Sequence, residues 1–204
     1  MNAIASGYDY PCEWVECTTE VKKSRFITRL GPVYNKEQAM AALDDARRDH
    51  PEARHHCSAY LIGAPHAAQL AAMDDDGEPA GTAGKPIFNV ISHKQVGDVA
   101  VVVIRYFGGI KLGAGGLVRA YAAATQAAFQ QARFCRKTPQ ASVEINCDFA
   151  QESALRHWFL AHQGELQTVA YGQQVRMQAV LPSQALPALK ERGRALGFAI
   201  RVTD

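Results

Sequence analysis

The last third of the sequence alternates between two hydrophobic periodicities, and this alternation leaves few folds open to it. Spacing by two, typical of half-buried strands, covers residues 141–149, 165–171, 174–181 and 198–202. Helical spacing covers residues 151–162 and 183–194. The resulting order, βαββαβ, predicts a ferredoxin-like domain. Because that fold carries many unrelated functions, the domain by itself names no activity.

The rest of the chain predicts another α+β domain. A boundary is indicated near Pro139, where a charged pair follows a long alanine-rich stretch and a new alternating pattern begins. We therefore predict one domain over residues 1–137 and a second over residues 138–204. In the first, we expect a helix between Asn35, a good N-cap, and Pro51. We also expect an alanine-rich helix over residues 116–134 and strands over residues 14–21, 24–30, 57–62 and 99–106.

Charge, hydropathy and cysteine usage exclude several classes of protein. The chain has 22 basic and 20 acidic residues, a formal net charge of +2, so we expect no strong nonspecific binding to DNA. The longest aliphatic run, residues 99–104, is too short to cross a membrane, and the first residues lack the pattern of a signal peptide. The five cysteines are odd in number and have no Cys-x-x-Cys spacing, so we expect reduced, buried thiols. Together these features predict a cytoplasmic protein without membrane association.

Two polar, glycine-rich segments are the candidate functional parts of the sequence. Residues 74–86 combine four carboxylates with three glycines, a threonine and a lysine, a composition that excludes a regular strand or a long helix. Residues 105–121 connect an apolar strand to the alanine-rich helix and contain five glycines. Glycines at a helix N-terminus leave backbone N–H groups uncovered, which favours anion binding. The alternatives are a solvated acidic turn for the first segment and tight packing for the second.

Both segments contribute candidate residues for binding a ligand or partner. The first contributes Asp75, Asp76, Gly77, Glu78, Gly81, Thr82, Gly84 and Lys85. The second contributes Arg105, Tyr106, Gly108, Gly109, Lys111, Gly113, Gly115, Gly116 and Arg119. Neither segment is a Walker A loop or a dinucleotide fingerprint, because those motifs exclude Pro79, Pro86 and Val118 at their positions.

The sequence favours a role other than catalysis, without deciding the question. His55 and His56 are adjacent, so on a strand they would point to opposite faces, and we predict no metal site. We find no nucleophile elbow and no zinc-protease motif. We therefore assign no catalytic residue and no cofactor.

The two segments also carry a resemblance to a known family. Together with Lys22-Lys23-Ser24-Arg25-Phe26 and Arg54-His55-His56-Cys57, they resemble the signature of the IMPACT family in order and spacing, over nearly the whole chain. The resemblance implies an N-terminal domain like the second domain of a small ribosomal-subunit protein, a fold shared with domain IV of elongation factor G and with galactokinase-type kinases. It implies a C-terminal domain similar to domain V of elongation factor G. For eukaryotic relatives, the resemblance implies regulators of translation that act by binding a protein of the amino-acid starvation pathway.

Three functions follow as hypotheses. The first is a translation-linked regulator that binds RNA, the ribosome or a translation factor. The second is an enzyme that binds a phosphorylated or nucleotide-like small molecule, with Asp75, Asp76 and Glu78 around a divalent ion. The third is a protein-interaction module built on the two loops. All three depend on one expectation, that the two glycine-rich segments meet in space.

Overall fold

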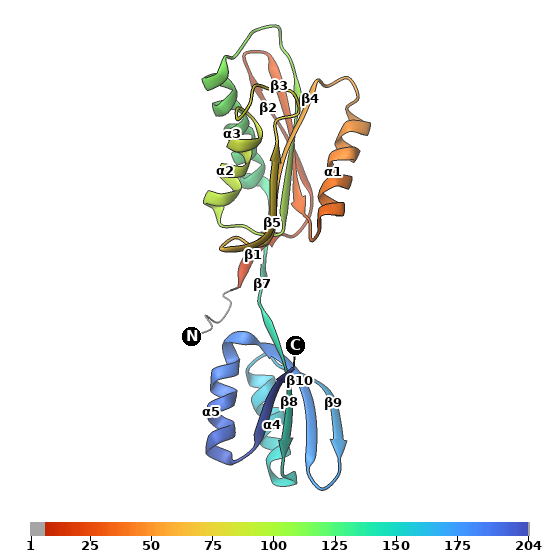
Figure 1. Ribbon diagram of the computed structural model, residues 1–204, viewed down its shortest axis with the longest axis vertical. Helices are drawn as coiled ribbons and strands as arrows, with labels where there is room; N and C mark the ends of the chain where they lie inside the picture. The colour runs from red at the N-terminus through yellow and green to blue at the C-terminus, as the bar shows by residue number, and fades with distance from the viewer. Residues whose placement is uncertain (1–6, 204) are drawn as a thin grey trace. The chain divides into compact units, whose positions relative to one another are not determined.

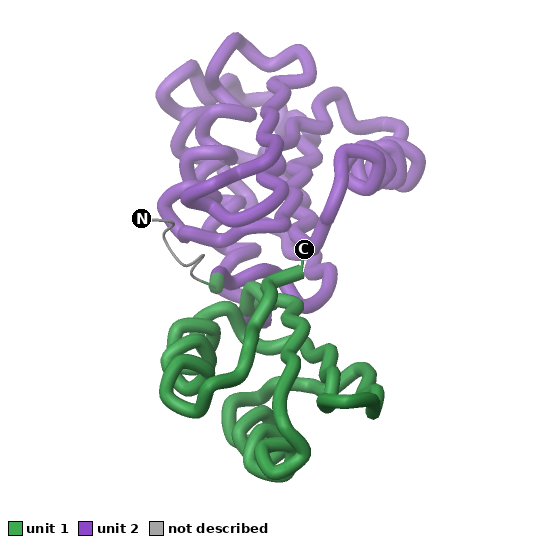
Figure 2. Tube along the Cα trace, turned by 60° about the horizontal axis from the view of Figure 1, so that its bottom comes forward, with its two compact units in different colours: residues 1–7, 138–204 green, residues 8–137 purple. Residues whose placement is uncertain are grey.

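The computed structural model describes residues 7–203 (Figure 1). The chain divides into two compact units, one of Tyr8–Lys137 and one in which Thr138–Asp204 carries all the secondary structure (Figure 2). The predicted first domain also includes residues 1–6, and the expected absence of a signal peptide rests partly on them; these residues lie outside the described ones. No helix within residues 7–203 combines the length and the hydropathy needed to cross a lipid bilayer.

The larger unit is built on a five-stranded antiparallel sheet with helices on both faces (Figure 1). The strand order is β2 (Val15–Val21), β3 (Ser24–Pro32), β6 (Val99–Tyr106), β4 (His55–Ala64) and β5 (Ala67–Asp74). Helices α2 (Gly84–Lys94) and α3 (Ala114–Gln131) pack on one face, and α1 (Lys36–Asp49) packs on the other. Asn35 caps α1 as predicted, because its side chain accepts a hydrogen bond from the Gln38 amide.

The central strand β6 explains why the sheet is covered on both sides. Val99, Val101 and Val103 belong to the core beneath α2 and α3, whereas Val102 and Ile104 belong to the core beneath α1. A strand that is apolar at consecutive positions must be buried on both faces. The alanines of α3 let its backbone approach the sheet closely, and Tyr121 is fully buried among them.

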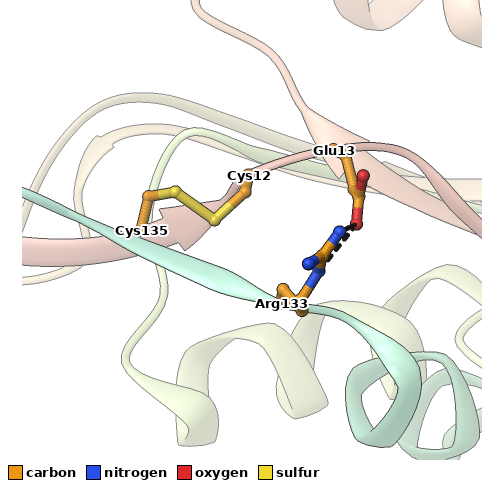
Figure 3. The surroundings of a disulfide bond; sticks show 4 residues. All are labelled: Cys12, Glu13, Arg133 and Cys135. Carbon is orange, nitrogen blue, oxygen red and sulfur yellow. Dashed lines mark hydrogen bonds and ion pairs between the residues drawn. A yellow bond between two sulfur atoms is a disulfide. The ribbon is translucent and has the colours of Figure 1, made fainter.

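A short two-stranded ribbon joins the two ends of the larger unit. Strand β1 (Tyr8–Pro11) pairs with β7 (Phe134–Lys137), and a disulfide links Cys12 to Cys135 (Figure 3). The expectation that all five thiols are reduced is therefore wrong for these two; Cys17, Cys57 and Cys147 are free and buried, as expected. Cys12 and Cys135 are 123 residues apart in the sequence. They come together only because β1 and β7, the first and last strands of the unit, pair with each other, and the sequence does not show this pairing.

A buried carboxylate, that of Asp98, also holds the two strands of the ribbon in place. Asp98 is 2% exposed and accepts hydrogen bonds from the Tyr8 hydroxyl (2.6 Å), the Lys137 ammonium (2.6 Å) and the Gly63 amide (2.7 Å). Burial acts to raise the pKa of Asp98, but these three donors outweigh it and hold the pKa below its usual value. The unit thus fixes its first and last strands by both covalent and ionic contacts.

The smaller unit has the predicted order βαββαβ. Its elements are β8 (Gln140–Cys147), α4 (Phe149–Ala161), β9 (Glu165–Tyr171), β10 (Val175–Pro182), α5 (Leu186–Leu196) and β11 (Ala199–Thr203). The antiparallel sheet has the order β11-β8-β10-β9, and its core includes residues of both helices. Helix α5 begins three residues later than predicted, because Ser183–Ala185 forms a single 3-10 turn first.

Candidate functional site

The two glycine-rich segments meet at one end of the larger sheet. Strands β5 and β6 both pair antiparallel with β4, so their C-terminal ends lie at the same end of the sheet. The first segment leaves β5 and leads into α2, and the second leaves β6 and leads into α3. Glu78 of the first segment joins Arg105 and Tyr121 of the second by hydrogen bonds of 2.6 and 2.8 Å.

Asp75 organises the first segment by binding its backbone. Its carboxylate accepts hydrogen bonds from the amides of Gly81 (2.7 Å), Ala83 (2.9 Å) and Gly84 (2.8 Å), at the N-terminus of α2. Burial acts to raise the pKa of Asp75, but the three amides outweigh it and lower the pKa below its usual value. The amides of Gly81, Ala83 and Gly84 are therefore already occupied by Asp75 and are not free to bind an anion.

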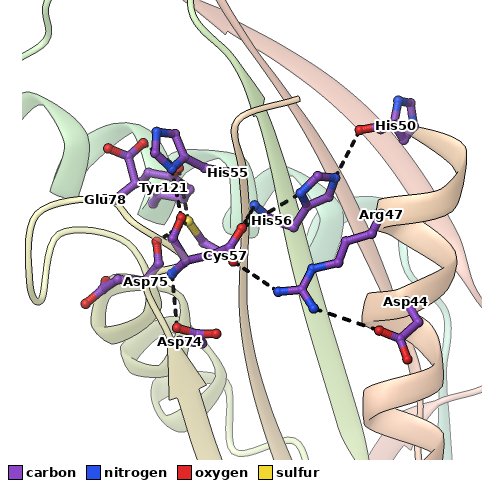
Figure 4. A network of polar contacts seen from close by, with 11 residues as sticks. Asp44, Arg47, His50, His55, His56, Cys57, Asp74, Asp75, Glu78 and Tyr121 are labelled. Atoms are coloured by element: carbon purple, nitrogen blue, oxygen red, sulfur yellow. Dashed lines mark hydrogen bonds and ion pairs between the residues drawn. The ribbon is translucent and has the colours of Figure 1, made fainter. Parts of the chain in front are cut away.

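A buried network connects the segments behind this loop (Figure 4). The side chains of Glu78 and Arg105 are 4% and 7% exposed, and they form an ion pair with a distance of 2.6 Å. The Tyr121 hydroxyl donates to the same Glu78 oxygen, and the Cys57 thiol lies 3.3 Å from that hydroxyl. Burial raises the pKa of both Tyr121 and Cys57. Cys57 is therefore a neutral thiol at physiological pH, which makes it a poor nucleophile.

Three histidines, His50, His55 and His56, continue the network toward α1 (Figure 4). Asp76 accepts hydrogen bonds from the His56 backbone amide (2.7 Å) and from the Arg47 guanidinium (3.0 Å). His56 is buried, and burial lowers its pKa. Its Nε2 lies 3.2 Å from the His50 carbonyl oxygen, whereas His55 Nδ1 lies 2.8 Å from that of Asp76. These contacts fix the loop to α1 and β4.

The carboxylates of the first segment are poorly placed to share a divalent ion. Asp75 is occupied by backbone amides, Asp76 by Arg47 and His56, and Glu78 by Arg105 and Tyr121. Within residues 7–203, no three side chains of histidine, cysteine, aspartate or glutamate are arranged to hold a metal ion. A bound ion would have to replace several of these internal hydrogen bonds.

The second segment, in contrast, leaves its helix N-terminus open. Gly113, with φ +72°, precedes α3, and in the described part of the chain no side chain caps this helix. The first turn of α3 contains no acidic residue. The Arg119 guanidinium lies close to Gly115 of that turn, since a Cβ on Gly115 would be 3.5 Å from one of its nitrogens. The positive end of the α3 dipole is therefore next to a cation rather than a carboxylate.

The turn between β2 and β3 lies beside the start of the loop that leads from β6 to α3. A Cβ on Gly108 would come within 2.0 Å of the Lys23 backbone, and the Gly108 amide donates to the Ser24 hydroxyl. The Arg25 guanidinium sits 4.5 Å from the centre of the Tyr106 ring. We define the basic loop surface as the exposed side chains of the β2–β3 turn, of the start of β3, of the loop after β6 and of the start of α3, namely Lys22, Lys23, Arg25, Phe107, Lys111 and Arg119.

The remaining predicted residues fall into two groups. Thr82 is buried and donates to the Pro79 carbonyl oxygen, and Tyr106 bonds to His50. Gly77, Gly81 and Gly109 have positive φ, which suits glycine at turns, and Lys85 and Gly116 complete the set at the starts of α2 and α3. The candidate residues did not include several members of the arrangement, namely Lys22, Lys23, Arg25, Arg47, His50, His55, His56, Cys57 and Tyr121.

Fold and site together define a class of protein: a two-unit α+β protein whose larger unit gathers a buried ion-pair network and an exposed basic loop at one end of its sheet. The chain belongs to the IMPACT family. The Impact N-terminal domain matches residues 22–129, and a domain of unknown function, DUF1949, matches residues 145–192.

Several relatives support this assignment. The chain is 40% identical over 173 residues to the IMPACT family member YigZ of Escherichia coli, covering 85% of each protein. It is 37% identical over 174 residues to an IMPACT family member of Haemophilus influenzae, covering 85% of this chain and 84% of the relative. A crystal structure described as a hypothetical protein is similar with a TM-score of 0.69 and 34% identity, covering 98% of both chains.

Proposed function

We propose that this protein is a translation-linked regulator that binds RNA through the basic loop surface. The observation that carries the proposal is a set of five exposed basic side chains in the β2–β3 turn, the start of β3, the loop after β6 and the start of α3, of which Arg119 lies beside an uncapped helix N-terminus. Among residues 7–203, none of these five forms an ion pair. Unpaired cations beside free backbone amides favour phosphate oxygens.

An exposed aromatic ring adds a contact that suits a nucleotide base. Phe107 is 49% exposed and lies in the same loop as Lys111. Single-stranded RNA is bound by grooves and loops that combine cations for the backbone with aromatic rings for the bases. A phosphorylated small molecule would use the cations and amides but would not require the ring.

The charge balance of the whole chain is consistent with this local surface. A net charge of +2 gives little long-range attraction for nucleic acid. Glu20 faces Arg25 in the register of β2 and β3, yet the surface keeps an excess of positive charge. We therefore expect moderate, salt-sensitive binding that depends on a few residues. The proposal also draws on the expected likeness of the two domains to domains IV and V of elongation factor G, the second through its ferredoxin-like order.

The test is fluorescence anisotropy with a labelled single-stranded RNA of mixed sequence over a series of salt concentrations. Each neutralised phosphate of a single strand contributes about −0.7 to the slope of log K against log salt, so five contacts give a slope of about −3 to −4. Lys111→Ala combined with Arg119→Ala makes the slope less negative by about 1 to 1.5. Phe107→Ala weakens binding by about 1–3 kcal/mol with little change in slope.

The matched control is Lys36→Ala, which removes an exposed lysine at the start of α1. The other end of α1 is the one near the site, since His50 after its last turn bonds to Tyr106. This variant should bind RNA as the unmodified protein does. Absence of binding at low salt refutes the proposal, and so does an equal effect of Lys36→Ala and the double variant. Strong binding of inorganic phosphate that is indifferent to Phe107→Ala favours a small anion over RNA.

A further inference from the structure

A groove of about 610 Å³ lies between helix α1 and the strands β2 and β3 of the larger unit. This volume is within the range of pockets that hold small ligands. In the middle of α1 the groove is lined by Ala41 and Ala42, and these short side chains leave it open. The residues that line it belong neither to the basic loop surface nor to the network around Glu78, so the groove is a separate feature of the unit.

The indole ring of Trp14 lines the groove and is held in place by the backbone of β3. A Cβ on Gly31 would lie 2.1 Å from this ring, so the ring packs directly on a position where only glycine leaves room for it. Trp14 is nevertheless 45% exposed, and Tyr34, which also lines the groove, is 49% exposed. The faces of aromatic rings attract cations, and tryptophan attracts them most strongly.

The carboxylates of the groove are only partly neutralised. Arg29 donates from Nε to Oε2 of Glu16 (2.7 Å) and from Nη1 to Oδ2 of Asp49 (2.8 Å), so two carboxylates share one cation. These carboxylate side chains are 50% and 49% exposed, and within residues 7–203 the second oxygen of each accepts no hydrogen bond. The other arginine of the groove, Arg48, is paired with Asp45. The lining therefore carries an excess of negative charge.

We propose that this groove binds a guanidinium group, carried either by a small molecule or by an arginine side chain of a partner protein. A guanidinium ion is planar, so it stacks on an indole ring, and its fork of N–H donors matches carboxylate oxygens. Because Arg29 already bridges Glu16 and Asp49, these two carboxylates lie close enough to share a planar cation. An anion would be repelled by the excess charge and by the negative face of the Trp14 ring. The proposal does not depend on RNA binding.

The test is isothermal titration calorimetry of the full chain with Nα-acetyl-arginine methylamide. The matched ligand is the corresponding citrulline compound, which has nearly the same shape without the charge. We expect saturable binding of the arginine compound and binding of the citrulline compound that is weaker by about tenfold or more. In a Trp158→Phe background, where Trp14 is the remaining tryptophan, the emission should change with the arginine compound and stay constant with the citrulline compound.

One pair of variants tests the carboxylates. Glu16→Gln should weaken binding of the arginine compound by about tenfold, because it removes a charged acceptor from the groove. The matched control is Glu13→Gln. Glu13 has the same exposure of 50% and is bonded to an arginine at 2.6 Å, but it does not line the groove. This variant should bind the ligand as the unmodified protein does. Circular dichroism of both variants shows whether the fold is retained.

A capped pentapeptide with arginine at its centre and glycine elsewhere separates the two sources of the guanidinium group. Tighter binding of the peptide than of the arginine compound supports a partner protein, and weaker binding supports a small guanidine. Absence of saturable binding of both ligands up to millimolar concentrations overturns the proposal. Equal affinities for the arginine and citrulline compounds also overturn it, as do equal effects of Glu16→Gln and Glu13→Gln.

Discussion

Two ion pairs of this protein have the same length and opposite environments, and they predict different costs of substitution. Glu78–Arg105 and Glu13–Arg133 both have a distance of 2.6 Å. The side chains of the first pair are 4% and 7% exposed, and those of the second are 50% and 78% exposed. Glu78→Gln and Glu13→Gln therefore make the same chemical change, the first at a buried site and the second at a solvent-exposed site.

The magnitudes follow from desolvation. Glutamine keeps an oxygen that can accept from Arg105 and Tyr121, but the Arg105 charge is then buried without a counter-charge. Removing one partner of a buried pair costs about 3–5 kcal/mol. An exposed pair is worth about 0–1 kcal/mol, because water and salt screen it. With a urea m-value of about 2 kcal/mol/M, Glu78→Gln lowers the midpoint of unfolding by about 2 M, and Glu13→Gln by less than about 0.5 M.

The assay is urea unfolding followed by tryptophan fluorescence. The chain has two tryptophans, Trp14 in the larger unit and Trp158 in the smaller one. A Trp158→Phe background therefore makes the signal report on the larger unit alone, which avoids mixing two transitions. Within this background, Glu78→Leu combined with Arg105→Met should be less destabilising than Glu78→Gln, because no charge remains buried.

The reasoning is refuted if Glu78→Gln and Glu13→Gln lower the midpoint by the same amount. It is also refuted if the double apolar variant is as unstable as the sum of its single variants, since the coupling between the two residues would then be absent.

Three further predictions use the same fluorescence assay. Cys135→Ser removes the disulfide to Cys12 and should lower the free energy of unfolding by at most about 5 kcal/mol, the loop-closure value for a separation of 123 residues. An unchanged midpoint of unfolding would contradict this. Asp75→Asn should lower the free energy of unfolding by about 1–2 kcal/mol at neutral pH. The pKa of Asp75 in the folded protein lies below its ordinary value of 3.8, so the stabilisation by this carboxylate is present above pH 3.8 and is lost as the pH falls through the folded pKa. The unfolding midpoints of the variant and of the unmodified protein should therefore converge in acid. Gly31→Ala places a Cβ 2.1 Å from the Trp14 ring and should cost about 1–3 kcal/mol with a shift in Trp14 emission; an emission spectrum identical to that of the unmodified protein would show that the ring is not displaced.

The smaller unit shows how much of a fold periodicity can predict. Each of its six main elements was expected, with bounds within about three residues, because every one has an apolar face with a clear period. The larger unit was predicted less completely. Strand β5 was missed because it has no buried residue and hence no alternation, and α2 was missed because its start lies inside a loop-like composition. The ribbon of β1 and β7 rests on a pairing between distant residues.

The sequence predicted which two segments form the candidate site, but it did not predict which of their side chains contact one another. Residue types marked the two segments, and Glu78 does join Arg105. The sequence could not show that Asp75 would occupy the amides of its own loop, because a carboxylate near glycines suits both a free and a self-bound loop. Cys57 and Tyr121 were missed since their partners lie 18 and 43 residues or more away. Lys23 was missed for the same reason.

The β1–β7 ribbon determines how the larger unit responds to mechanical load. Tyr8 and Lys137 face each other where the chain leaves the ribbon, so a pull on the two ends opens the paired strands one rung at a time. Cys135 faces Tyr10 in the third of the four pairs, so separation of the strands stops at the Cys12–Cys135 bond, which then carries the tension. Force spectroscopy should record a short extension under oxidising conditions and full unravelling once a dithiol has been added.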